Sequence, residues 1–169
     1  MRSLIILAAL FTVFTVSVHA QPGFAGTYVL RGASRAESVR DAGIEAAIRE
    51  MGIGRGIARR RLAASTPVPR RIVVEERGDR LHIVIAGAYE DLNALPDGNA
   101  FRFEDEFGYE HTARLYRRPN TLVITLRGHG DCRIELRFSA DRSRVTYVMR
   151  IRSEHLPDDV RYQATYQRR

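Results

Sequence analysis

The chain contains no lysine, no tryptophan and a single cysteine, Cys132. One cysteine cannot form a disulfide within the chain, so packing alone has to stabilise the fold. Because lysine is absent, arginine supplies all 27 basic residues, which exceed the 20 acidic ones and give a formal net charge of +7. No His or Asp pattern beside Cys132 indicates a reactive thiol, and we expect a small buried side chain on a strand.

Long apolar runs are also scarce, and the one that is present lies at the N-terminus. Leu4–Val18 is apolar except for Thr and Ser, Arg2 precedes it, and Val18-His19-Ala20 is a small-x-small cleavage site. This pattern is typical of a secretory signal peptide, and the run is short for a membrane-spanning helix. We therefore predict a signal peptide at residues 1–20, a single domain at residues 21–169, and a periplasmic or secreted protein.

The basic charge raises the question of nucleic acid, because the sequence pI is about 10.3. The arginines are spread along the chain among Glu and Asp, and export would separate the protein from nucleic acid, so we predict no such partner. The one dense cluster is Arg59-Arg60-Arg61. It fits either a solvated helix face or a contact with an anionic membrane surface, ligand headgroup or protein partner.

The first third of the mature chain predicts one strand followed by two helices. Phe24–Leu30 alternates as a strand, and Ser34 with Glu37 has the spacing of a capping box for a helix that extends to about Met51. Gly52 and Gly54 break this helix, and a second helix is predicted at Arg55–Ala64 before Pro67 and Pro69.

The remainder predicts turn-linked strands with one loose region at Tyr89–Asn99. The expected strands are Arg71–Glu76, Arg80–Ala88, Ala100–Phe107, Glu110–Arg117, Thr121–Arg127, Cys132–Phe138, Arg144–Arg152 and Val160–Gln167. Several have one apolar and one polar face, as antiparallel strands around a single core do. The prediction is a mainly β fold: an antiparallel up-and-down β-barrel of about nine to ten strands, with a helix-turn-helix lid after the first strand. A β-sandwich is the competing architecture.

Four stretches, in this order, resemble the fatty-acid-binding (intracellular lipid-binding) family of the calycin superfamily. Phe24-x-Gly26-Thr27-Tyr28-x-Leu30 is similar to that family's opening strand, and Glu50–Ala64 to its helix-turn-helix. Ile72–Ile83 resembles the hairpin that follows, and Thr165-Tyr166-Gln167-Arg168 resembles the closing strand. The wider calycin group, including lipocalins, is a close alternative, since Gly26-Thr27-Tyr28 is similar to the lipocalin Gly-x-Trp.

The resemblance implies reversible binding of a fatty acid or other lipophilic molecule inside the barrel, with the helical pair as portal. Tyr166 stands at the family's carboxylate-binding tyrosine, while Ala164 stands where the family usually has an arginine. The candidate ligand residues are Tyr28, Tyr147, Tyr162 and Tyr166, which we expect to face inward, and Arg137 and Arg150 as headgroup partners. For each tyrosine, a core position with a locally bonded hydroxyl is the alternative, and alternation places both arginines on polar faces.

Catalytic patterns are lacking. The histidines have no metal-ligand spacing, and no serine lies in a nucleophile elbow. We therefore predict a monomeric binding protein that is not an enzyme and has no cofactor and no metal. Two other function classes stay open: a non-catalytic envelope interaction protein with a filled barrel and a basic surface patch, and an outer-membrane barrel.

Overall fold

A computed structural model describes residues 23–104, 110–128 and 130–169, which form ten strands and two helices. The predicted signal peptide at residues 1–20 lies outside the described residues. The helices are α1 (Ala33–Ala47) and α2 (Arg55–Ser65). The strands are β1 (Gly26–Leu30), β2 (Arg71–Arg77), β3 (Arg80–Ile85), β4 (Tyr89–Ala94), β5 (Asp97–Glu104), β6 (Glu110–Arg118), β7 (Thr121–Arg127), β8 (Asp131–Phe138), β9 (Arg144–Arg152) and β10 (Val160–Arg168).

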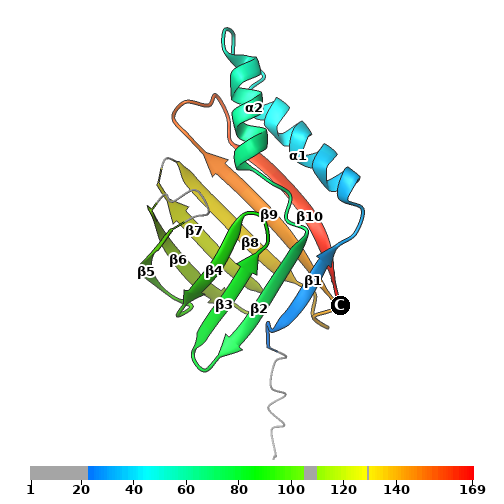
Figure 1. Ribbon diagram of the computed structural model, residues 1–169, viewed down its shortest axis with the longest axis vertical. Helices are drawn as coiled ribbons and strands as arrows, with labels where there is room; N and C mark the ends of the chain where they lie inside the picture. The colour runs from blue at the N-terminus through cyan, green and yellow to red at the C-terminus, as the bar shows by residue number, and fades with distance from the viewer. Residues whose placement is uncertain (1–22, 105–109, 129) are drawn as a thin grey trace, which may run out of the picture.

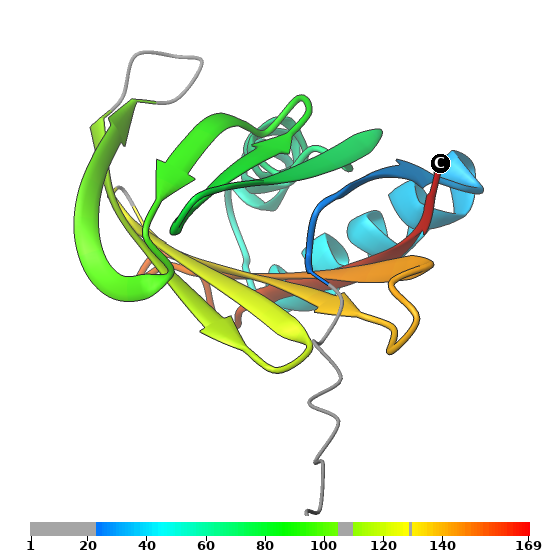
Figure 2. The same ribbon diagram turned by 90° about the horizontal axis from the view of Figure 1, so that it is seen from below.

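The ten strands form one antiparallel sheet that curls into a nearly closed barrel (Figures 1 and 2). Its order is β4-β3-β2-β1-β10-β9-β8-β7-β6-β5, so consecutive strands pair throughout except β4 and β5, which are the two edges of the sheet. The first and last strands pair directly, with Leu30 opposite Tyr166. The predicted up-and-down barrel with a helical pair after the first strand is confirmed, and the sandwich alternative is wrong.

The loose region predicted at Tyr89–Asn99 is instead part of the sheet, as β4 and the start of β5. Asp91 has a left-handed φ of 68°, and the register between β3 and β4 shifts at this point. An irregularity of this kind breaks the two-residue alternation on which the strand prediction relied. The predicted strand Ala100–Phe107 ends at Glu104, and its last three residues lie outside the described part of the chain.

The predicted capping box at the start of α1 is wrong. The helix is capped by Gly32, whose φ is 70°, and no side chain bonds to the exposed amides. Ser34 therefore lies inside the first turn rather than before it, and Glu37 pairs with Arg70 at 2.8 Å. The helix also ends at Ala47, four residues before the predicted end at Met51.

The two helices cover one end of the barrel and are held very differently. Helix α1 lies along β10 and buries Ile44, Ala47 and Ile48 against Val160. Figure 2 shows the helix and the strand side by side. Helix α2 has no buried residue at all. It is fastened to α1 by Glu45, which accepts hydrogen bonds from two arginines of α2. A helix with so little buried surface opens at low free-energy cost.

Candidate ligand-binding site

A cavity of about 570 Å³ lies between α2 and the strand ends beneath it, and we call it the mouth cavity. Its walls come from the loop before α2, from α2 itself, from the ends of β4 and β6–β9, and from the β9–β10 loop. The residues that define it best are Met51, Ile57, Leu62, Leu126, Cys132 and Ile151. Ligand pockets of about 300–1,000 Å³ with mostly apolar walls are typical of small-molecule sites.

The polar groups of the mouth cavity lie mostly toward the helical lid. Arg61 and Ser65 come from α2, and His155 comes from the β9–β10 loop. His111 lies on the barrel side, where its ring stacks on Phe103 at a centroid distance of 5.5 Å. The cavity is therefore apolar along the barrel wall and contains cationic and hydrogen-bonding groups at its edge.

Cys132 is a partly buried wall residue of this cavity, and it lies on a strand as the sequence predicted. Burial raises the pKa of its thiol to about 12, while a hydrogen bond from Tyr89, at 3.8 Å between Oη and Sγ, acts weakly in the opposite direction. The thiol is therefore protonated at neutral pH, and its role here is to supply apolar surface.

All four candidate tyrosines face the barrel interior and are buried. Tyr162 donates its hydroxyl to the carbonyl of Pro67 at 2.9 Å, and Tyr166 donates to that of Pro69 at 2.8 Å. Burial raises the pKa of both hydroxyls. These two tyrosines thus hold the linker between α2 and β2, a local partner of the kind that the sequence left open as their alternative role.

Tyr147 lies deeper in the barrel than the mouth cavity, because Met149 lies between it and the wall residue Ile151 on β9. Its ring centroid is 5.9 Å from that of Tyr162, and its hydroxyl contacts Sδ of Met149 at 3.3 Å. Burial raises its pKa well above the usual value, with further contributions from Tyr162 and Cys132. Tyr147 and Tyr162 therefore pack in the barrel core, and neither of them lines the mouth cavity.

The opposite end of the barrel is filled. Phe24 packs on Phe138 with a centroid distance of 4.8 Å, and the guanidinium of Arg142 lies 4.6 Å above the Phe24 ring. Tyr28 completes this plug, edge-on to Phe138 at 5.6 Å. Its hydroxyl is fully buried and has no hydrogen-bond partner among the described residues. The free space of the barrel is thus at the helical end.

The two candidate headgroup arginines lie on the outer face. Arg137 donates to Glu135 at 2.9 Å, and Arg150 donates to Asp159 at 2.6 Å. Both side chains are more than 40% exposed. The structure therefore separates them from the four tyrosines, in agreement with the alternation of their strands.

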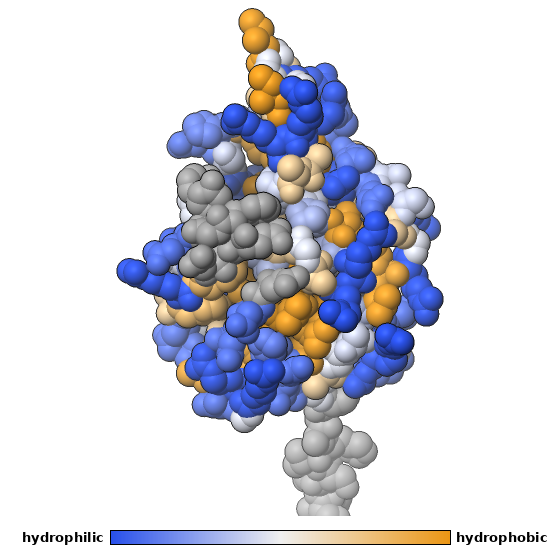
Figure 3. All heavy atoms as spheres, in the orientation of Figure 1, coloured by the Kyte–Doolittle hydropathy of each residue, from blue (hydrophilic) through white to orange (hydrophobic). Residues whose placement is uncertain are grey.

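The arginine triplet of α2 is divided. Arg59 bonds to Glu45 of α1, and Arg61 lines the mouth cavity. Arg60 is exposed, and neither Arg60 nor Arg61 has an ion pair within the described ranges. Beside them, Ile53 is fully exposed and Ile57 is 53% exposed; Figure 3 shows apolar atoms at the tip of the helical pair.

Sequence reasoning placed the ligand among the tyrosines and missed the mouth cavity. Its wall residues come from the ends of strands and from one face of a short helix, where no motif marks them. The usable signal was Ile57 with Leu62 on the helix, facing Cys132 and Ile151 at strand ends. Across residues 23–104, 110–128 and 130–169, no cluster of three or more metal-ligating side chains is present. No helix in these ranges has the length and apolarity to span a membrane.

Ten antiparallel strands in this order, with two helices between the first and second, define the β-barrel fold of the fatty-acid-binding proteins. No protein-family model matches the chain, and a comparison with curated protein sequences finds no match. Solved structures do match. The brain fatty-acid-binding protein of Drosophila melanogaster aligns with a TM-score of 0.52 and 17% identity, over 86% of this chain and 99% of that one.

Two further structures extend this likeness. Fatty-acid-binding protein 1 of Echinococcus granulosus aligns with a TM-score of 0.53 and 9% identity, over 86% of this chain and 96% of that one. The Schistosoma mansoni fatty-acid-binding protein, solved with arachidonic acid, aligns with a TM-score of 0.50 and 15% identity over the same shares. At these identities the likeness establishes the fold, as the sequence motifs predicted.

Proposed function

We propose that this protein binds a fatty acid or another small lipophilic molecule in the mouth cavity, with α2 as the lid. The observation that carries the proposal is the cavity itself: about 570 Å³ of mostly apolar space at the only helix without a buried residue in the described chain. The fold is the one in which the Schistosoma protein was solved with arachidonic acid.

In this proposal the ligand's chain lies along Leu126, Cys132 and Ile151. A polar headgroup would point toward Arg61 and His155 at the edge of the cavity. A charged headgroup is costly to bury without a partner, and the described groups that can pair with a carboxylate lie at this edge. Tyr166, in contrast, would act by fixing the linker that carries α2.

The exposed tip of the helical pair would make contact with a membrane surface. Ile53 and Ile57 supply apolar area there, and Arg60 and Arg61 supply unpaired positive charge beside it. Anionic lipid surfaces attract basic segments by about 1 kcal/mol for each charge near the surface. We further propose that the protein is exported, because the N-terminal segment has the pattern of a signal peptide. We also propose that it is a monomeric carrier without catalytic activity.

The proposal is tested by displacement of a fluorescent fatty-acid probe from the purified mature protein. Ala58→Trp fills the cavity from α2, whereas Ala64→Trp places the same side chain on the exposed side of the same helix. We expect saturable micromolar binding that weakens tenfold or more in Ala58→Trp and is unchanged in Ala64→Trp. Absence of saturable binding, or equal affinity in the two variants, would refute a site under α2.

One observation favours a second function. The end of the barrel around Phe24 is closed by its packing on Phe138, which fits a non-catalytic envelope protein that acts through its surface. A folded, monodisperse protein that binds no probe and extracts no lipid would favour this function over lipid binding.

A further inference from the structure

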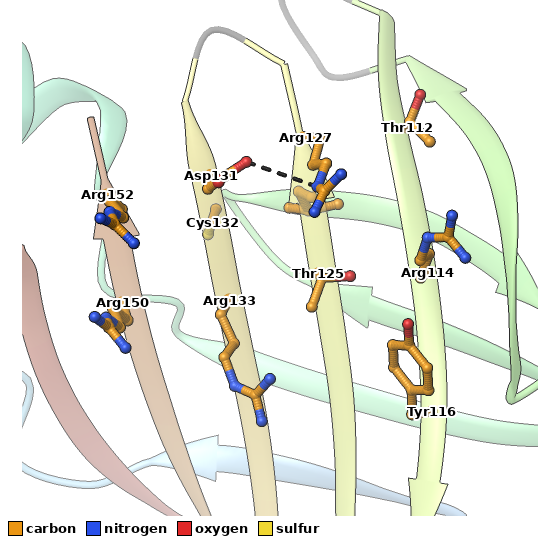
Figure 4. Close-up of a pocket in the computed structure, with 11 residues that line it drawn as sticks. Thr112, Arg114, Tyr116, Thr125, Arg127, Asp131, Cys132, Arg133, Arg150 and Arg152 are labelled. Carbon is orange, nitrogen blue, oxygen red and sulfur yellow. Dashed lines mark ion pairs between the residues drawn. The ribbon is translucent and has the colours of Figure 1, made fainter. Parts of the chain in front are cut away.

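A second concave site lies on the outside of the barrel, across β6, β7, β8 and β9 (Figure 4). It has a volume of about 490 Å³, and Leu126 and Cys132 contribute to its walls as well as to those of the mouth cavity. We call it the outer groove. The side chains that define it are Arg114, Arg127, Arg133, Arg150 and Arg152, with the hydroxyls of Thr112, Thr125 and Tyr116 between them.

The strand register places these arginines in line. Arg114 lies opposite Thr125, Thr125 opposite Arg133, and Arg133 opposite Arg150, which in turn lies opposite Arg161. Like charges directly opposite on one face of a sheet destabilise it. Two such arginine pairs in succession lower the stability of the sheet. The fold itself does not need arginine at these positions, because their side chains reach solvent and do not pack in the core.

The carboxylates around the outer groove compensate this charge only in part. Asp159 is shared by Arg150 and Arg161, at 2.6 and 2.9 Å, and Glu135 is shared by Arg133 and Arg137. Asp159 and Glu135 are only 11% and 18% exposed, whereas their arginine partners are 39–62% exposed. The carboxylates thus lie beneath, and the guanidinium groups form the accessible layer.

The remaining arginines carry still more uncompensated charge. Arg127 is 3.9 Å from Asp131, the one acidic residue that lines the groove. Within the described ranges, the one hydrogen bond of the Arg114 side chain is to the carbonyl of Gly98, at 3.0 Å. Arg152 has no carboxylate partner among the described residues. The groove therefore presents a net positive surface with guanidinium donors free to bind an anion.

Spacing indicates what kind of anion fits. From β6 to β9 the row crosses three strand intervals of about 4.8 Å, or roughly 14 Å in total. The second row, with Arg127 and Arg152, lies two residues further along the strands, about 7 Å away. One phosphate cannot reach all these donors. Guanidinium groups bind phosphate oxygens in a two-pronged geometry, and several arginines in two rows suit several phosphates.

We propose that the outer groove is a binding site for a molecule that carries two or more phosphate groups, either free in solution or as a lipid headgroup. This site is distinct from the lipid site under α2, because none of its arginines lines the mouth cavity, although Leu126 and Cys132 line both. Arg114 and Arg152 would be its main determinants, since neither is engaged by a carboxylate in the part of the chain that the structure describes.

The test is calorimetric titration of the mature protein with inorganic tripolyphosphate, orthophosphate, and vesicles of phosphatidylcholine with or without cardiolipin. The variant is Arg114→Gln/Arg152→Gln. Neither arginine pairs with a described carboxylate, so this double substitution leaves no described carboxylate without its partner. The matched control is Arg118→Gln/Arg144→Gln, which removes the same charge from exposed strand positions outside the groove.

We expect tripolyphosphate to bind at least tenfold more tightly than orthophosphate, and the groove variant to lose tenfold or more of that affinity while the control keeps it. Binding to cardiolipin vesicles that is weakened in the groove variant and kept in the control would identify a lipid headgroup as the ligand. Tripolyphosphate binding without vesicle binding would identify a soluble ligand. Equal loss in variant and control, or equal affinity for the two phosphates, would overturn the proposal. Affinity for the fatty-acid probe should not change in either variant, so failure here is distinct from failure of the lipid site.

Discussion

Two buried tyrosines should respond in opposite directions to the loss of their hydroxyls. In Tyr166→Phe, the buried carbonyl of Pro69 loses its donor at 2.8 Å. An unsatisfied buried acceptor costs about 1–3 kcal/mol. In Tyr28→Phe, the hydroxyl that is removed is fully buried and has no partner among the described residues. Removal of such a group relieves a desolvation cost, and we expect a gain of about 1 kcal/mol.

The two variants should therefore differ by about 2–4 kcal/mol in the free energy of unfolding, although both delete one oxygen from a buried ring. For a domain of this size, each kcal/mol corresponds to about 2–4 °C in Tm. The assay is urea unfolding followed by circular dichroism, because the chain has no tryptophan for fluorescence. Equal destabilisation of both variants would show that the Tyr28 hydroxyl is satisfied and would refute the reasoning.

Three further predictions concern the lid, the cavity wall and the packing of α1. A hydrogen bond from Arg59 holds the pKa of Glu45 at about 2, below its ordinary 4.5. The tie between the helices should thus be complete above pH 4.5 and lost as pH falls through about 2. Over this window the protection factors of the α2 amides, which correct each exchange rate for the intrinsic rate at that pH, should fall in the wild-type protein but not in Glu45→Gln. Cys132 has a pKa of about 12, so in the folded protein it should react with a maleimide far more slowly than it does in the urea-unfolded protein. A bound fatty acid should slow this reaction further. A reaction rate that is the same with and without fatty acid would contradict a ligand at this wall. Gly43→Ala should destabilise the protein, because the added Cβ would overlap a backbone carbonyl of β10. Gly56→Ala has no atom near the added Cβ, and it should stabilise α2 by up to about 1 kcal/mol. Thermal melts in which Gly43→Ala is more stable than Gly56→Ala would contradict the packing of α1 on β10.

The architecture could be predicted because it follows from local patterns. Strands β8–β10 alternate between buried apolar and more exposed residues, the hairpin at Gly78 has a turn signature, and Gly54 with Pro67 delimits α2. Such signals depend only on neighbouring residues. Where the local pattern was interrupted, at Asp91 in β4, the strand was missed. The capping box predicted at Ser34 and Glu37 was wrong because Gly32, with its positive φ, forms the N-cap of α1 instead.

The site was harder, because it depends on which residues the barrel brings together. Alternation correctly placed Tyr147 and Tyr162 inside and Arg150 outside. It could not show that the end near Phe24 is filled, since filling depends on ring packing across strands far apart in sequence. The alignment of Arg133 with Arg150 was equally hidden, because it requires the register between two strands.

The most direct test of the central claim is a crystal structure of the mature protein grown with a brominated fatty acid. Proposed binding under α2 predicts anomalous bromine signal between Leu62 and Ile151, with the carboxylate directed toward Arg61. Bromine elsewhere in the barrel would contradict this position. An empty mouth cavity at saturating ligand would contradict lipid binding as the function of this protein.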